Sequence, residues 1–363
     1  GCFSPINRLH SSNSGFTSKE PWRYSRDARA TMEAHLRLRH RLVPYLYTWA
    51  RRSAGEGIAP VRPVYHDHPR ELAAYEHRGS FCFGDLLVVP FTSPLDVATG
   101  LGRELTWLPD GVWYDLPTGR RYEATTGGRG RMLSLSRPLD RIGVLARAGS
   151  VIPLAGNLTE AAGDNPRELE IVVVPGGSGS FTLEEDDGSA QPGQDQIART
   201  HMALTWPEAE EEDGADVVLR IRLEGAAEVV PASRLVTVRL LAGQVAGAWL
   251  GVGERARRLA TEEVSGDGFT LGAGTLVHLE ELSRQELIDG VQLVLRGTKH
   301  SPADWRDEVH AILDAARVEY MAKDLAWDAV QRGLSGTALL GELEALGLPE
   351  TLRAAVAEVL PHS

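Results

Sequence analysis

The feature that most constrains the fold is a strand–helix–strand pattern in the first 65 residues. Cys2 to Ile6 is a short apolar run, and residues 59–65 are extended by their prolines and valines. Between these runs, apolar side chains recur at helical spacing from Met32 to Ala50. Two such strands lie parallel in one sheet, because the helix carries the chain back to the starting edge. The pattern therefore predicts a βαβ unit.

The sequence also predicts where this helix begins, bends and ends. Ser25 is a good N-cap, and Asp27 in the first turn places negative charge at the positive end of the helix dipole. Pro44 removes one backbone hydrogen bond and crowds the preceding turn, so we expect a kink there. Arg51, Arg52 and Gly55 are typical of a helix C-terminus.

A polar loop follows the first apolar run and carries the candidate site. It contains Arg8, His10, Ser11 and Ser12. The chain begins within an apolar run, without an initiator Met, so we interpret residues 1–80 as the last part of a (β/α)8 barrel whose earlier strands lie upstream of Gly1. In such barrels, the loops at the C-terminal ends of the strands form the active site.

Beyond residue 80 the pattern changes to short strands separated by turns that contain Gly and Asp. This spacing is typical of antiparallel sandwiches. We predict a multidomain α/β plus all-β chain: the C-terminal part of a (β/α)8 barrel at 1–80, a proximal β-sandwich at 81–157, a distal β-sandwich at 158–298 and a helical tail at 299–363. In the tail, we expect Trp305, Tyr320 and Trp327 to pack onto the distal sandwich.

Charge and cysteine content limit the classes of partner. The formal net charge of −12, from 38 basic and 50 acidic residues, argues against nucleic acid and anionic membranes and fits a neutral sugar or other small ligand. Two cysteines, Cys2 and Cys82, are too few for a disulfide framework, so we expect a reducing, cytoplasmic compartment. A signal peptide and self-association into a homo-oligomer are left open.

A histidine pair, His66-Asp67-His68, follows the second predicted strand. His-x-His spacing can bind a metal ion, but no third ligand is evident in the sequence. We therefore predict no metal ion and no cofactor, and a role for this segment at a pocket rim or in loop packing.

Acidic and aromatic groups form two further candidates. The carboxylates of Glu184 to Asp187 lack the alternating spacing of a calcium loop, so we predict a solvated turn there. Trp107, Trp113 and Tyr114 are side chains of the type that stacks on sugar rings. Alternating aromatics in short strands usually fill a sandwich core, and we favour that interpretation.

Several motifs in order resemble the C-terminal part of glycoside hydrolase family 31. They are FSPINRLHSS (3–12), KEPWRY (19–24), LRLRHRLVPYLYTW (36–49), APVRPVYHDHP (59–69), FGDLLVVPF (83–91), TWLPDGVWYDLPTG (106–119) and IGVLARAGSVIPL (142–154). A weaker similarity to the start of the family's distal sandwich lies in FTLEEDDG (181–188). The resemblance covers roughly the first half of the chain, and the ordered series is far more specific than any one motif.

This resemblance implies a retaining α-glycosidase that hydrolyses α-linked glucosides of an oligosaccharide or α-glycoside substrate. The family's two catalytic carboxylates lie upstream of the histidine motif, which here means upstream of Gly1, so the isolated chain is expected to be inactive. An α-xylosidase, α-transglycosylase or α-glucan lyase of the same family is an alternative. A non-catalytic carbohydrate-binding or scaffold protein is the alternative from another class.

The resemblance also assigns roles in substrate binding. His10 matches the histidine that hydrogen-bonds hydroxyls of the sugar next to the cleaved bond, since an imidazole can donate to one hydroxyl and accept from another. The alternative is a loop histidine bonded to the backbone. Arg8 would face the same side as His10 on a strand, and either orients an active-site carboxylate or makes a structural salt bridge.

Overall fold

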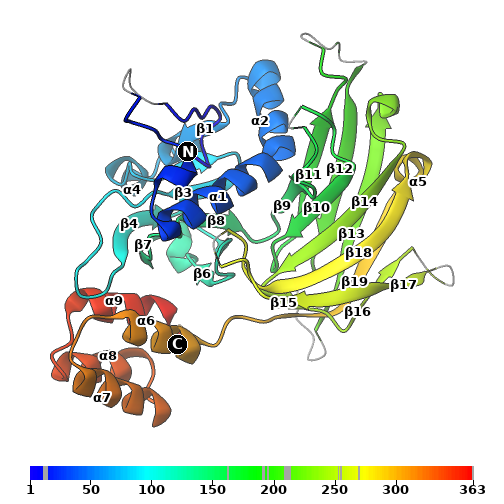
Figure 1. Cartoon of the computed structure of the whole chain (residues 1–363). Helices are drawn as coiled ribbons and strands as arrows, with labels where there is room; N and C mark the ends of the chain where they lie inside the picture. Colours follow the sequence, from blue (N-terminus) through cyan, green and yellow to red (C-terminus); the bar gives the residue numbers. More distant parts are fainter. Residues whose placement is uncertain are drawn as a thin grey trace.

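Two β-sheet assemblies and two groups of helices make up the protein, seen in the computed structural model of Figure 1. The structure describes residues 1–361 except 11–14, 162, 190–192, 194, 195, 208–213, 252, 254, 255 and 269. Helix α2 lies between the smaller assembly and the larger sheet, and the C-terminal helices lie below the smaller assembly. Among the described helices, none has the length and apolar character needed to cross a lipid bilayer.

The helices gather at the two ends of the chain. They are η1 (Pro21–Arg23), α1 (Arg26–Arg41), α2 (Val43–Glu56), α3 (Val64–Asp67), α4 (Leu72–Glu76), α5 (Arg284–Asp289), α6 (Trp305–Ala315), α7 (Tyr320–Gln331), α8 (Gly336–Ala345) and α9 (Glu350–Val359), with single turns η2 (Thr126–Gly128) and η4 (Ala227–Val229) between strands. A short helix, α4, thus lies between β1 (Val61–Pro63) and β2 (Phe81–Phe83).

The smaller assembly is an antiparallel sandwich. Its six-stranded sheet has the order β1 (Val61–Pro63), β2 (Phe81–Phe83), β3 (Leu86–Val89), β8 (Gly143–Arg147), β5 (Val112–Asp115) and β6 (Arg121–Glu123). A second layer is the pair β4 (Gly102–Leu108) and β7 (Arg131–Arg137). Trp107, Trp113 and Leu145 belong to the buried cluster between the two layers.

The larger sheet curls until its edge strands β11 and β9 approach each other. Its order is β11 (Gly179–Glu185), β12 (Ala198–Thr205), β13 (Ala215–Gly225), β19 (Val291–His300), β16 (Gly247–Leu250), β17 (Arg257–Val264), β18 (Gly274–Ser283), β14 (Ser233–Leu241), β10 (Glu168–Val173) and β9 (Val151–Ala155), while β15 (Gly243–Gln244) pairs with β19. Strand β9 pairs with β10, so the chain passes from the smaller sheet to the larger one between residues 147 and 151.

The predicted βαβ unit is wrong. Strand β1 pairs antiparallel with β2, with Val61 opposite Phe83, and the described residues 1–10 contain no strand. Parallel pairing occurs between β10 and β14 instead. The first apolar run is short and buries Phe3 against neighbouring side chains, while prolines limit β1 to three residues. What the structure establishes is a β-rich fold, and the barrel origin of residues 1–80 stays a prediction.

The long helical pattern forms two helices. Helix α1 ends at Arg41 and α2 begins at Val43, with Pro44 in its first turn, so the expected kink is a break at Leu42. Ser25 is the N-cap residue of α1, as predicted. Helix α2 ends at Glu56, just beyond the predicted end, because Gly57 takes the left-handed conformation (φ 75°) that terminates helices.

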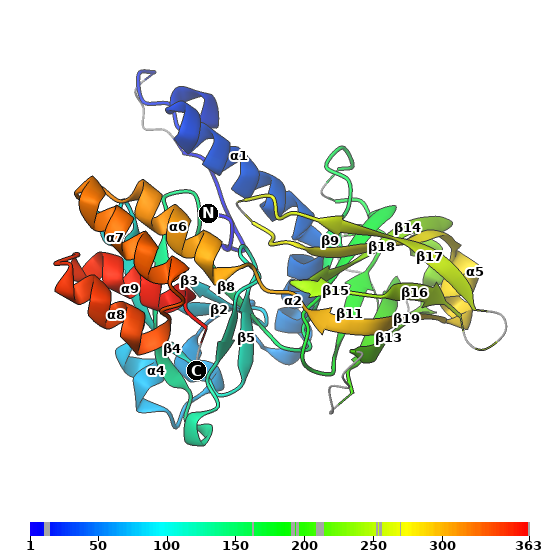
Figure 2. The same ribbon diagram turned by 90° about the horizontal axis from the view of Figure 1, so that it is seen from below.

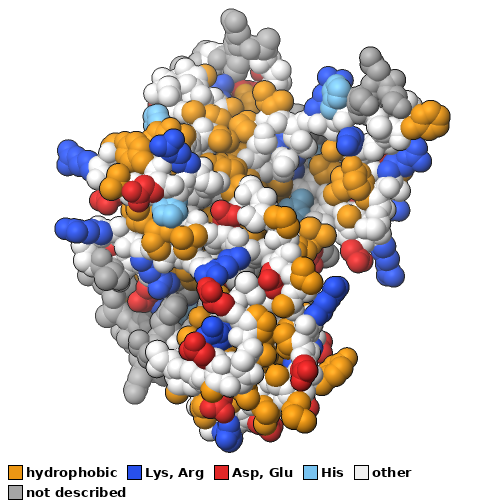
Figure 3. Space-filling model, turned by 90° about the vertical axis from the view of Figure 1, so that its left-hand side faces the viewer, with side chains coloured by type: hydrophobic (Ala, Val, Ile, Leu, Met, Phe, Trp, Pro, Cys, Tyr) orange, Lys and Arg blue, Asp and Glu red, His pale blue; other side chains and the backbone are white. Residues whose placement is uncertain are grey.

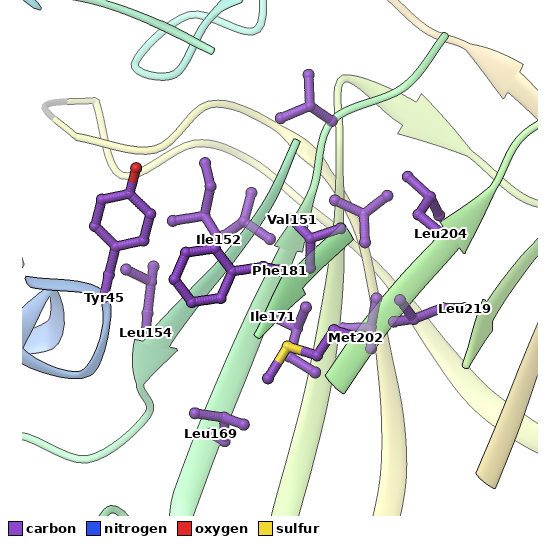
Figure 4. Packing of buried hydrophobic residues seen from close by; sticks show 14 of the residues in the cluster. Tyr45, Val151, Ile152, Leu154, Leu169, Ile171, Phe181, Met202, Leu204 and Leu219 are labelled. Atoms are coloured by element: carbon purple, nitrogen blue, oxygen red, sulfur yellow. The ribbon is translucent and has the colours of Figure 1, made fainter. Parts of the chain in front are cut away.

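Helix α2 joins the two sheets through a continuous hydrophobic core. The ring of Tyr45 stacks on Phe181 of β11 at 5.3 Å between ring centroids and lies 6.1 Å from Phe83 of β2. Ile152 and Leu154 of β9 lie beside these rings (Figure 4). The same buried cluster continues through Met202 and the strands behind it. Both sheets are therefore positioned by the same helix.

The helical tail packs against the smaller sandwich, which corrects the predicted placement on the distal one (Figure 2). Its four helices form a hydrophobic cluster of their own, and Trp305 and Trp327 are partly buried in it. Tyr320 is 82% exposed and packs onto neither sandwich. The apolar residues of the tail thus pack against one another. Other contacts hold the tail to the sandwich.

Those contacts centre on Glu358 of α9, which is 8% exposed. Its carboxylate accepts hydrogen bonds from Arg137 (2.5 Å), Arg120 (2.9 Å), the Tyr122 hydroxyl (2.7 Å) and the backbone N–H of Ser136 (2.6 Å). All four partners belong to the smaller sandwich. A buried carboxylate is stable only when it is paired and hydrogen-bonded in this way, so Glu358 fixes how α9 docks.

Replacing Glu358 with alanine leaves the buried guanidinium groups of Arg137 and Arg120 without this counter-charge. We expect the variant to lose about 3–5 kcal/mol of unfolding free energy, measured by chemical denaturation. Glu350→Ala is the matched control, because the Glu350 side chain is 77% exposed beside Arg103, and it should change stability by less than about 1 kcal/mol. Equal effects of the two substitutions would show that the network does not hold the tail.

This network also predicts a pH dependence. Burial by itself raises the pKa of Glu358, but Arg137 and Arg120 outweigh burial and hold that pKa below the ordinary value of 4.5. Its stabilising contribution is therefore complete above pH 4.5 and is lost as pH falls through the lowered pKa. The stability difference between wild type and Glu358→Gln should shrink as denaturation is repeated at increasingly acidic pH; a difference that widens would contradict this assignment.

Candidate functional site

The N-terminal segment is held in place by one arginine of α1. The Arg39 guanidinium donates hydrogen bonds to the backbone carbonyls of Gly1 (3.1 Å), Cys2 (3.2 Å) and Pro5 (3.1 Å), and also to that of Ser4. Carbonyl groups outside a sheet or helix need such partners, and the planar guanidinium presents several donors in a fixed geometry. Arg39 thus replaces the strand ladder that the sequence predicted here.

Hydrophobic contacts anchor the same segment. Phe3 is 6% exposed and meets Phe83 edge-to-face, with 5.7 Å between ring centroids. Burial raises the pKa of the Cys2 thiol to about 12, against the opposing charges of the Gly1 amino group and Arg39. The thiol is therefore protonated at neutral pH, and its role is packing rather than nucleophilic chemistry.

The two predicted sugar-binding residues follow this anchored part. Arg8 and His10 are both exposed and lie in an irregular segment, so the expectation that they share one face of a strand is wrong. Ser11 and Ser12 lie outside the described residues. Arg8 and His10 are therefore accessible side chains that follow residues 1–5, which Arg39 holds in place. A sugar contact by either residue stays a prediction.

The acidic run at 184–187 is not the solvated turn that the sequence predicted. Asp186 is 7% exposed and accepts hydrogen bonds from Tyr47 and Arg51 of α2, and Glu184 accepts from Arg51 at 3.0 Å. Glu185 forms a two-point ion pair with Arg234, which is 1% exposed. Three of the four carboxylates thus connect β11 to α2 and β14, and Asp187 alone is exposed.

The His66-Asp67-His68 segment lies at the edge of a cavity. Asp67 accepts hydrogen bonds from Arg62, and the imidazole of His68 packs edge-on against Trp107 at 5.3 Å between ring centroids. His68 lines the cavity together with Asp67, as the pocket-rim interpretation expected. Within the part of the chain that the structure describes, no three His, Cys, Asp or Glu side chains are grouped closely enough to hold a metal ion.

The aromatic candidates belong to the hydrophobic core, as predicted. Trp107 is 4%, Trp113 7% and Tyr114 2% exposed. The indole N–H of Trp113 donates to the carbonyl of Pro109 at 2.9 Å, so its polar edge is satisfied within the sandwich. Side chains this deeply buried do not offer a flat face to a sugar ring.

Comparison with known sequence families matches two parts of the chain in order. Residues 1–49 match the glycosyl hydrolases family 31 TIM-barrel domain, and residues 57–152 match the glycosyl hydrolase family 31 C-terminal domain. The first match contains Arg8, His10 and Arg39, and the second contains most of the smaller sandwich.

Individual relatives agree with these matches. An α-xylosidase of Saccharolobus solfataricus is 30% identical over 213 residues, which are 58% of this chain and 27% of that protein. Lysosomal α-glucosidase of Mus musculus is 26% identical over 243 residues, 62% of this chain and 25% of that protein. The chain thus spans about a quarter of the length of these curated relatives.

Solved structures extend the likeness of the fold beyond the matched domains. A family 31 dextranase of Flavobacterium johnsoniae, complexed with isomaltotriose, superposes with a TM-score of 0.61 at 19% identity and covers 78% of this chain and 34% of its own. The family 31 α-xylosidase of Xanthomonas citri gives a TM-score of 0.53 at 26% identity, covering 66% and 24% of the two chains.

The family matches cover the N-terminal segment, α1 and most of the smaller sandwich, and the likeness to solved structures extends the similarity of the fold beyond them. The chain belongs to glycoside hydrolase family 31.

Sequence reasoning missed the residue that organises the site. Arg39 lies three positions after Leu36 and three before Leu42, on the apolar face of the helix. An arginine on such a face needs acceptors from another segment, and this placement is the signal that pointed to it.

We expect Arg39→Met to free the N-terminal segment, because methionine keeps the apolar stem but donates no hydrogen bond. Hydrogen exchange of residues 1–10 should accelerate at least tenfold, and the unfolding free energy should fall by about 1–3 kcal/mol. The control is Arg37→Met, since the Arg37 side chain is 61% exposed and pairs with Glu33 at 3.7 Å. Unchanged exchange in Arg39→Met would refute the anchoring role.

Proposed function

We propose that this chain is the C-terminal part of a retaining α-glycosidase that hydrolyses α-linked glucosides. The observation that carries the proposal is the order of the two family 31 matches, barrel domain at 1–49 and C-terminal domain at 57–152, along one continuous segment. Within that segment, Arg39 binds the backbone carbonyls near the N-terminus, and the accessible Arg8 and His10 follow.

His10 is the proposed sugar-binding residue. A neutral imidazole offers one donor and one acceptor, which suits a pair of sugar hydroxyls. Contacts to hydroxyls that tighten in the transition state lower the barrier to glycoside cleavage. Arg8 lies close enough in sequence to orient a carboxylate at the same site by a two-point hydrogen bond.

The surface near this segment supports a role inside a larger barrel. Ile6 is 87%, Phe16 97% and Trp22 65% exposed. Figure 3 shows hydrophobic side chains spread among charged ones over one face of the molecule. Large exposed apolar side chains mark surfaces that another element covers, and the remaining barrel strands are the proposed cover.

Retaining cleavage needs two carboxyl groups about 5–5.5 Å apart, one as nucleophile and one as acid and base. Among the described residues, the buried acids are all paired with arginines: Asp115 and Glu358 with Arg137, Glu185 with Arg234 and Asp186 with Arg51. We therefore propose that the catalytic pair comes from residues outside this sequence and that the chain alone is inactive.

An α-xyloside is the second candidate substrate. The relative from Saccharolobus solfataricus, at 30% identity, and the structure from Xanthomonas citri, at 26%, are both named α-xylosidases. A transglycosylase or a lyase of the same family would share the fold and differ in the acceptor of the glycosyl group. A carbohydrate-binding scaffold is the alternative without turnover.

The test compares this chain with the polypeptide encoded by its complete open reading frame, using p-nitrophenyl α-glucoside and α-xyloside. We expect turnover from the longer polypeptide alone, and the ratio of the two rates identifies the preferred sugar. In that polypeptide His10→Ala should lower kcat/KM by about 10²-fold through the loss of transition-state hydrogen bonds. His66→Ala, at an exposed histidine, is the matched control.

Three results would overturn the proposal. Turnover by this chain alone would show that its own carboxylates suffice. No turnover by the longer polypeptide, together with saccharide binding, would favour the scaffold protein. Equal activity of His10→Ala and His66→Ala would remove His10 from the site.

A further inference from the structure

The cavity that Asp67 and His68 line has a volume of about 400 Å³ and lies where the two sheet assemblies meet. Its lining comes from α2, the β1–α3 segment, the β2–β3 turn, the β8–β9 turn and the start of β11. Arg8 and His10 are not among its lining residues. Its volume falls in the range of about 300–1,000 Å³ typical of small-molecule sites.

One wall of this cavity carries a rigidly held carboxylate. Arg62 is 7% exposed and donates to both oxygens of Asp67, at 2.7 and 3.1 Å. The same guanidinium donates to the carbonyls of Ala59 and Gly84, at 3.1 Å each. Four acceptor atoms of the protein thus hold the Arg62 guanidinium, while the exposed Asp67 carboxylate has further lone pairs that these bonds do not use.

Three further polar groups, Asp85, Arg147 and His68, line the cavity, and of these Arg147 also donates a hydrogen bond to the carbonyl of Asp110 at 3.1 Å. Asp85 and Arg147 are both exposed and carry opposite charges. Burial lowers the pKa of His68, so its imidazole is neutral at pH 7 and offers both a donor and an acceptor. The lining thus presents donors and acceptors together with balanced formal charge: Arg62 and Arg147 against Asp67 and Asp85.

The opposite wall is built from backbone. Gly149 has φ 85°, and a Cβ atom there would lie 2.6 Å from the carbonyl oxygen of Ser178. A Cβ atom at Gly179 would lie 2.3 Å from the carbonyl oxygen of Gly149. Only glycine permits these two turns to approach so closely, and the result is a rigid wall with peptide groups at the cavity surface.

We propose that this cavity is a second, non-catalytic binding site for a neutral saccharide unit of the substrate. The ligand class rests on the proposed function. A neutral polyhydroxyl ring needs several donors and acceptors within a few ångströms and no net charge, and the lining supplies this combination. An anion such as phosphate would be attracted by Arg147 but repelled by Asp67 and Asp85.

The position of the cavity indicates how a saccharide bound there would affect the substrate. It joins the first turn of α2, at Tyr45, and the smaller sandwich to β9 and β11 of the larger sheet. A saccharide bound there would keep an oligosaccharide chain close to the enzyme without occupying the groups that cleave it. Local concentration of substrate rises when a second site is linked to the first in this way.

Binding is measured on this chain by isothermal titration calorimetry and saturation-transfer NMR, with maltose and isomaltose as probes and inorganic phosphate as the anionic comparison. Asp85→Ala removes an acceptor, and Ser180→Trp fills the cavity from an exposed position on β11. Each should weaken disaccharide binding at least tenfold. Asp324→Ala and Thr261→Trp, both at exposed positions outside the cavity, are the matched controls and should bind like wild type.

Retained binding in Ser180→Trp, in a variant whose thermal unfolding matches wild type, would overturn the proposal. So would the absence of disaccharide binding, tighter binding of phosphate than of disaccharide, or loss of binding in His10→Ala with retention in Asp85→Ala. The measurement needs no turnover, so its failure differs from failure of the proposed function: an active longer enzyme whose cavity variants bind normally would reject this site alone.

Discussion

The structure depends on the contact that Tyr45 makes at the junction of the two sheets. Its ring lies between Phe181 of the larger sheet and Phe83 of the smaller one, and its hydroxyl accepts from the Asp85 N–H at 2.7 Å. At 1% exposure, this side chain has no room to move without breaking both contacts. Helix α2 therefore sets the relation of the sheets, and with it the cavity between them.

Buried ion pairs make further connections between strands, helices and the C-terminal tail. Glu185 with Arg234 joins β11 to β14, Asp186 with Arg51 joins β11 to α2, and Glu358 joins the tail to the smaller sandwich. Such pairs add less net stability than hydrophobic packing, but losing one partner is costly because the other charge stays buried. They determine which surfaces meet, and so explain why a tail with its own core docks in one orientation.

The N-terminal segment lies in the part of the chain that matches the family 31 barrel domain, and it carries the residues that we propose bind the sugar. Arg39 donates hydrogen bonds to the carbonyls of Gly1 and Pro5 and so holds this segment in place. The accessible Arg8 and His10 follow directly after it. A sugar-binding residue needs this kind of support, since misplacement by about 1 Å can remove most of its effect on the rate. The chain spans about a quarter of the length of its curated relatives, and we propose that the catalytic pair lies in residues outside this sequence.

The sequence by itself determined the family, the helices at both ends, the change to short strands after residue 80 and the burial of Trp107, Trp113 and Tyr114, because motifs, helical periodicity and alternation are local. Tertiary structure alone decided the rest. A three-residue strand at Val61 takes its direction from its partner β2. The carboxylates of Glu185 and Asp186 are buried, and that of Glu184 is partly buried, because Arg51 and Arg234 of distant segments pair with them. Pairing direction and charge neutralisation depend on which segments meet in space, and the residues concerned are up to 135 positions apart.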